Sequence, residues 1–67
     1  MIRVLVNGAL GRMGSEVCKK VYSEAGLELV GAVDIKEGVV ALGDGVKVTT
    51  DLLAAINETK PDVVVDF

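Results

Sequence analysis

A chain of 67 residues forms one small domain at most, and a domain of this size buries only ~60% of the surface of its unfolded chain. The net charge of −3 and the pI near 4.7 argue against nucleic acid or an anionic membrane as a partner. Hydrophobic residues make up 51% of the chain but only Tyr22 and Phe67 are aromatic, so we expect the aliphatic core that is typical of parallel α/β sheets.

Residues 2–6 are apolar and rich in β-branched side chains, which is typical of a parallel strand buried on both faces. Three glycines, Gly8, Gly11 and Gly14, follow at intervals of three. We expect Gly8 to turn the chain, Gly11 to leave room for a pyrophosphate at the backbone, and Gly14 to let the next helix pack closely. Unpaired N–H groups at the start of that helix, at the positive end of its dipole, can bind phosphate. Because the spacing varies from the usual G-x-G-x-x-G, a plain glycine-rich turn is the alternative.

An amphipathic helix is predicted at residues 12–24, ended by Gly26 as a left-handed cap. Its apolar side chains recur at helical spacing: Met13, Val17, Val21 and Ala25. We expect Met13 to pack in the core and Cys18 to be a small buried hydrophobic residue. A single cysteine excludes an internal disulfide and, with no secretory signal pattern, favours a reducing cytoplasm. No apolar run approaches the ~18 residues of a transmembrane span.

Residues 27–33 form the second predicted strand, and Asp34 ends it. This acid lies 20 residues beyond Gly14, where a carboxylate that binds the adenosine ribose belongs; a solvated turn residue is the alternative. An acid there favours NADH, because a 2′-phosphate would meet its charge. Lys36 could offset that repulsion, so the use of both NADH and NADPH stays open.

The rest of the chain predicts a loop at 36–45 with room for one helical turn, a strand at 46–48, a helix reaching about Glu58 and a strand at 63–65. Thr49 or Thr50 is expected to cap that helix, with Asp51 in its first turn, and Lys60-Pro61 to stop it. Right-handed crossovers then give an α/β fold with a parallel sheet of order 3-2-1-4 and one helix on each face. A ligand is expected at the switch point between strands 1 and 4. The last strand is left as an uncovered edge, so we expect the 67-residue chain to be marginally stable and prone to associate.

Three stretches of the chain resemble one enzyme family. They are Val6-Asn7-Gly8-Ala9-Leu10-Gly11-Arg12-Met13-Gly14, Leu29-Val30-Gly31-Ala32-Val33-Asp34 and Pro61-Asp62-Val63-Val64-Val65-Asp66-Phe67. Together they are similar to the start of the dihydrodipicolinate reductases, also called 4-hydroxy-tetrahydrodipicolinate reductases. Gly11-Arg12-Met13-Gly14 is the most distinctive piece. The resemblance covers the whole chain, and the chain covers about the first quarter of such an enzyme.

The resemblance implies that residues 1–67 are the first half of a Rossmann-type dinucleotide-binding domain, with the substrate domain absent. It implies an NAD(P)H-dependent reductase of lysine and diaminopimelate biosynthesis that acts on a small molecule and is a homo-oligomer at full length. In that family, histidine and lysine residues of the later domain bind the substrate and handle protons. We therefore expect no catalytic residue and no metal ligand in this chain, and no catalysis by it alone.

The predicted cofactor-binding residues are Gly8, Ala9, Leu10, Gly11, Arg12, Met13, Gly14, Asp34, Lys36 and Phe67. Arg12 either lies over the pyrophosphate or ribose or is an exposed arginine at a helix start. Phe67 either lies beside the nicotinamide end, as the resemblance implies, or is a core aromatic. Two other functions stay open: a free-standing small domain that binds an adenine nucleotide or a protein, and another oxidoreductase or CoA-type nucleotide fold with the same opening.

Overall fold

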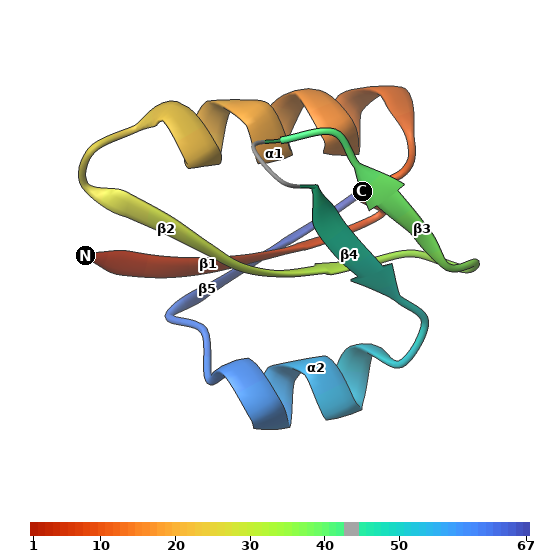
Figure 1. Ribbon diagram of the computed structural model, residues 1–67. Helices are drawn as coiled ribbons and strands as arrows, with labels where there is room; N and C mark the ends of the chain where they lie inside the picture. The colour runs from red at the N-terminus through yellow and green to blue at the C-terminus, as the bar shows by residue number, and fades with distance from the viewer. Residues whose placement is uncertain (43–44) are drawn as a thin grey trace.

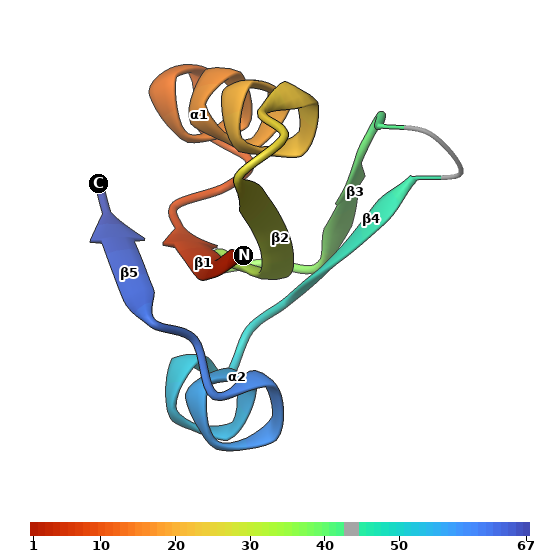
Figure 2. The same cartoon turned by 90° about the vertical axis from the view of Figure 1, so that its left-hand side faces the viewer.

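The computed structural model describes residues 1–42 and 45–67 of the chain. A five-stranded sheet forms the middle layer, with one helix on each face (Figures 1 and 2). The elements in chain order are β1 (Ile2–Asn7), α1 (Arg12–Ser23), β2 (Leu27–Val33), β3 (Gly38–Val40), β4 (Val46–Thr49), α2 (Leu52–Thr59) and β5 (Val63–Asp66). Within the described residues, neither helix is long and apolar enough to cross a membrane.

The strands lie in the order β3-β4-β2-β1-β5. The strands β4, β2, β1 and β5 are parallel, and their order is the one that the right-handed crossovers predicted. Helix α1 connects β1 to β2 and α2 connects β4 to β5, which places the two helices on opposite faces of the sheet (Figure 2). The predicted α/β fold with one helix on each face is therefore confirmed for these elements.

Strand β3 corrects the prediction of a loop at 36–45. It pairs antiparallel with β4, and the pairing joins Val40 to Val46 and Gly38 to Val48. Val40 is buried and joins the core while Val39 is exposed, which is the alternation of a half-buried strand. Antiparallel strands can be joined by a short connection. The glycines of residues 36–45 argued against a crossover helix, but they are compatible with a hairpin. Positions 43 and 44 of the predicted loop lie outside the described residues.

The core has two parts because β1 is buried on both faces. Val4 and Val6 face α1, where they pack in a cluster with Cys18 and other small aliphatic side chains. Leu5 faces the other way and packs with Val33 and Ala55 beneath α2. Alternate residues of one apolar strand thus serve both layers, as expected for a sheet covered on both sides.

Helix α1 packs through Gly14 onto the turn that follows β1. A Cβ on Gly14 would overlap the carbonyl oxygen of Gly8 and would lie 2.7 Å from its carbonyl carbon. The predicted close packing is confirmed, although the helix meets the turn rather than the strand itself. The buried face continues through Cys18 and Val21, so the expectation of a buried cysteine is confirmed. Met13 was expected in the core but is 68% exposed. It precedes the buried Gly14, and neighbouring residues of a helix point about 100° apart around its axis.

The helix ends differ from the predicted caps. Helix α1 ends at Ser23, followed by Glu24 in an extended conformation, and Gly26 does not have a positive φ. At α2 the cap is Asp51, whose carboxylate accepts a hydrogen bond of 3.0 Å from the N–H of Ala54. A carboxylate accepts this bond more strongly than the predicted threonine hydroxyls would.

The predicted stop of α2 at Lys60-Pro61 is confirmed, and Lys60 adopts the left-handed conformation there with φ 49°. Strand β5 pairs with β1 on one side, and Val63 and Val64 remain 45% and 40% exposed. Figure 2 shows β5 beside the area that α1 covers. This exposed strand fits the expected association of the chain, which stays a prediction.

We predict that Gly14→Ala lowers the free energy of unfolding by about 1–3 kcal/mol, because the backbone of Gly8 must move to admit the methyl group. Gly26→Ala is the matched control, since a Cβ at Gly26 has no atom within 4 Å. It should be neutral or stabilise by up to about 1 kcal/mol. Urea unfolding followed by circular dichroism measures both, and equal stabilities of the two variants would contradict the close packing.

Candidate functional site

The candidate site lies where β1, β2 and β5 end, at the carboxyl edge of the parallel strands. The loop from Gly8 to Gly11 leaves this edge and leads into α1. The N–H groups of Gly8 and Ala9 both donate to the carbonyl oxygen of Val33, at 2.7 and 3.0 Å. The N–H of Gly11 donates to the carbonyl of Gly8 at 3.1 Å. The loop is therefore tied to the end of β2 and folded back on itself.

Gly8 turns the chain, as predicted. Its φ of +88° lies in the region that favours glycine. A Cβ there would also lie 3.2 Å from the Cβ of Phe67. The turn thus depends on glycine both for its backbone conformation and for the close approach of the residue after β5.

The N-terminus of α1 lacks a side-chain cap. Gly11 is the N-cap residue and makes no capping hydrogen bond through a side chain, and no acid lies in the first turn. Helix α2 differs, because Asp51 caps it. Each helix start has N–H groups without partners in the helix, which attract negative charge. The N–H groups at the start of α1 therefore remain available to bind an anion that is not part of the described chain.

Asp34 lies at the end of β2, and its carboxylate reaches the glycine loop. One oxygen accepts from the N–H of Leu10 at 2.8 Å and the other from the N–H of Ile35 at 2.7 Å. The hydrogen bonds from Ile35 and then Leu10 lower the pKa of Asp34 most, desolvation raises it, and the backbone N–H of Gly11 and the charge of Lys36 lower it further. The carboxylate is therefore ionised at neutral pH.

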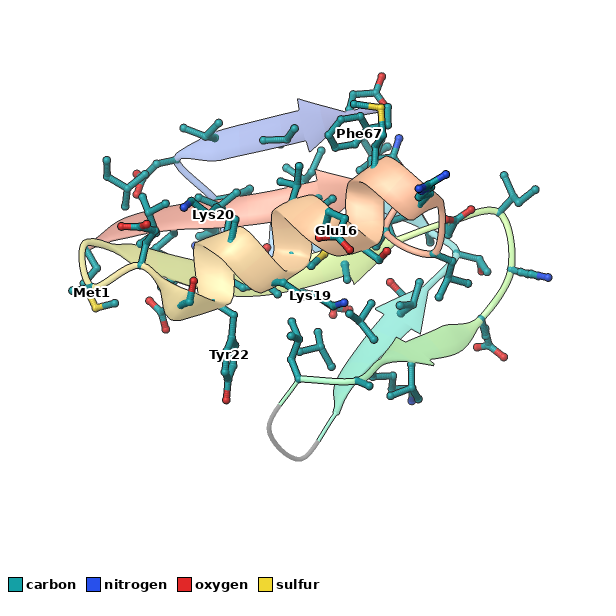
Figure 3. The ribbon with its side chains drawn as sticks, turned by 90° about the horizontal axis from the view of Figure 1, so that it is seen from above. Met1, Glu16, Lys19, Lys20, Tyr22 and Phe67 are labelled. Atoms are coloured by element: carbon teal, nitrogen blue, oxygen red, sulfur yellow. The ribbon has the colours of Figure 1, made fainter. Side chains whose placement is uncertain are left out.

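Phe67 lies against the glycine turn. Its N–H donates to the carbonyl of Asn7 at 3.2 Å, and the Asn7 side chain donates to the Asp66 carboxylate at 2.7 Å. Phe67 is 52% exposed in the described chain, and both interpretations of this residue stay predictions. Figure 3 shows Phe67 at the end of β5, beside the first turn of α1. The pair of Asn7 and Asp66 was not predicted, although both residues end neighbouring strands at the switch point.

The remaining predicted residues surround this loop. Ala9 is fully buried and Leu10 packs against the core, while Arg12, Met13 and Lys36 are exposed. Among the ion pairs of the described residues, none includes Arg12 or Lys36. The structure thus brings Asp34 to Leu10 and Phe67 to Gly8, and it leaves the two cations on the surface. In the described part of the chain, His, Cys, Asp and Glu side chains form no group of three or more that could hold a metal.

Comparison with known proteins places the chain among related sequences. The family described as "Dihydrodipicolinate reductase, N-terminus" matches residues 2–67. A protein of Methanocorpusculum labreanum named 4-hydroxy-tetrahydrodipicolinate reductase is 49% identical over 67 residues, which are 100% of this chain and 26% of that protein. Proteins of the same name from Dehalococcoides mccartyi and Methanothermobacter thermautotrophicus are 46% and 43% identical, over 98% and 100% of this chain and 27% and 29% of their own lengths.

The chain thus spans about a quarter of the length of the curated relatives it matches. No solved structure matches it.

We predict that Asp34 titrates below the ordinary aspartate value of 3.8. Because folding lowers this pKa, the stability that Asp34 contributes is complete above 3.8 and is lost as the pH falls through the folded-state value. Carboxyl carbon NMR measures the titration, and the amide shift of Leu10 should follow the same curve. In Asp34→Asn that Leu10 transition should vanish. A pKa at or above 3.8, or a Leu10 amide that does not respond, would contradict the hydrogen bond.

Proposed function

We propose that this chain, which belongs to the dihydrodipicolinate reductase N-terminal family, binds NADH or NADPH through the loop between β1 and α1. It would then be the first half of a Rossmann-type dinucleotide-binding domain. The observation that carries the proposal is the start of α1, which has neither a side-chain cap nor an acid in its first turn. A pyrophosphate would accept hydrogen bonds from the backbone N–H groups there without needing a basic side chain.

Gly11 is the residue over which the pyrophosphate would lie. It is exposed, and its φ of −70° and ψ of 164° suit any residue. The fold therefore does not require glycine at this position for its backbone conformation. A side chain here would occupy the space next to the open N–H groups, which supports a role for Gly11 in ligand approach.

Asp34 is proposed to bind the hydroxyl groups of the adenosine ribose. Each of its oxygens accepts one backbone hydrogen bond and keeps capacity for another. The negative charge of this carboxylate would repel a 2′-phosphate, which is the reason to propose a preference for NADH. Lys36 lies close enough to contribute to the lowered pKa of Asp34, so it would offset part of the repulsion and allow NADPH as well.

The other loop residues complete the proposed subsites. Ala9 and Leu10 would shape the loop, Arg12 would lie over the pyrophosphate or ribose, and Met13 would flank it. Phe67, packed against Gly8, would mark the direction of the nicotinamide.

For the full-length protein we propose the activity named for its relatives, reduction of 4-hydroxy-tetrahydrodipicolinate in lysine and diaminopimelate biosynthesis. The bound dinucleotide would supply the hydride. This chain contains no histidine, and its role would be to bind and orient the dinucleotide. Other parts of the full-length protein would bind the substrate and handle protons.

We predict that Gly11→Ala in the full-length protein weakens the binding of both NADH and NADPH by about tenfold, because the added methyl group lies in the path of the pyrophosphate. The added Cβ would lie 3.3 Å from the Gly8 oxygen, a contact that a small shift can relieve, so the variant should fold. Isothermal titration calorimetry measures the affinities, with Gly26→Ala as the control expected to bind like the wild type. A folded Gly11→Ala protein with unchanged affinity would refute the phosphate-loop assignment.

A further inference from the structure

Leu10 lies in the middle of the glycine loop. The residues before and after it are held by backbone hydrogen bonds of their own. Before it, Gly8 and Ala9 are bonded to the end of β2. After it, Gly11 is bonded back to Gly8 and leads into α1. The backbone N–H of Leu10 itself donates to the carboxylate of Asp34, at 2.8 Å. This bond fixes the peptide before Leu10 in the middle of the loop.

The side chain of Leu10 has a second point of attachment, on β3. A Cβ on Gly38 would lie 3.0 Å from both terminal methyl carbons of Leu10 and 3.6 Å from its Cγ. A side chain at position 38 would therefore require the methyl groups of Leu10 to shift by a few tenths of an ångström. Gly38 does not have a positive φ, so its backbone conformation does not explain a glycine here. Its distinguishing feature is the close contact with Leu10.

We propose that Asp34 and Gly38 are positioning residues, which fix the conformation of the glycine loop through the backbone and the side chain of Leu10. This inference rests on the proposed function, because the loop is the proposed phosphate site. It gives β3 a role in binding: the strand would set how the loop is held without contacting the pyrophosphate. Asp34 would then serve two purposes, one toward the ribose and one toward the loop.

The proposal predicts that a methyl group at position 38 disturbs the glycine loop only when the Leu10 side chain is present. In Gly38→Ala the added methyl group would press on the terminal methyl groups of Leu10, and the glycine loop would shift together with Leu10. If Leu10 is first shortened to alanine, the two terminal methyl carbons that crowd position 38 are gone. The effect of Gly38→Ala should then largely disappear, which is the non-additivity expected of two residues in contact.

Affinity for NADH is the first measurement, by calorimetry on the full-length protein. Gly38→Ala should weaken binding about three- to tenfold, and Gly26→Ala should change it by less than about twofold. In the Leu10→Ala background, the further change on adding Gly38→Ala should be below about twofold. Wild-type affinity in Gly38→Ala, or an equal loss in both backgrounds, would overturn the inference.

Hydrogen exchange without any ligand is the second measurement, and it separates this inference from the proposed function. Exchange of the Leu10 amide should speed up about tenfold in Asp34→Ala and in Gly38→Ala but not in Gly26→Ala. Unchanged exchange in the first two variants would overturn the positioning role. If the wild type bound neither NADH nor NADPH, the proposed function would fail, and the exchange result would still decide whether Asp34 and Gly38 hold the loop.

Discussion

The contact of α1 with the carbonyl group of Gly8 is the constraint on which the rest of the structure depends. Its oxygen accepts a hydrogen bond from the N–H of Gly11, and a Cβ on Gly14 would overlap it. The positive φ of Gly8 turns the chain, and Gly14 lets α1 pack directly on the turn. The open N-terminus of α1 is thereby placed at the carboxyl edge of the sheet, beside the end of β5.

The region around the start of α1 also combines groups of opposite charge. The helix begins with glycine and carries no capping side chain, while Asp34 accepts hydrogen bonds from Leu10 and Ile35 across the loop. The same small region thus has N–H donors at a helix start and an ionised carboxylate at a strand end. A molecule with both a phosphate and a sugar diol matches this pair of charges, and a dinucleotide has both. In the proposed complex, the helix start would attract the phosphate and the carboxylate would accept hydrogen bonds from the hydroxyl groups.

The parallel strands and α1 could be predicted from sequence because their signals are local: apolar runs, helical spacing and glycines at fixed intervals. Strand β3 could not, since Gly38 and Gly45 mark a loop locally, and only pairing with β4 makes residues 38–40 a strand. The exposure of Met13 depends on which side of α1 meets the Gly8 turn, which is a matter of tertiary packing. The acid at the end of β2 was predicted for the site, but its hydrogen bond to Leu10 joins residues distant in sequence, and Gly38 was missed for the same reason.

A crystal structure of the full-length protein with NADH would test the central claim most directly. The account predicts pyrophosphate oxygens at about 2.7–3.2 Å from backbone nitrogens at the start of α1. It predicts ribose hydroxyl groups on the carboxylate of Asp34, with the Leu10 bond kept. A dinucleotide bound with its pyrophosphate away from the start of α1 would contradict the account.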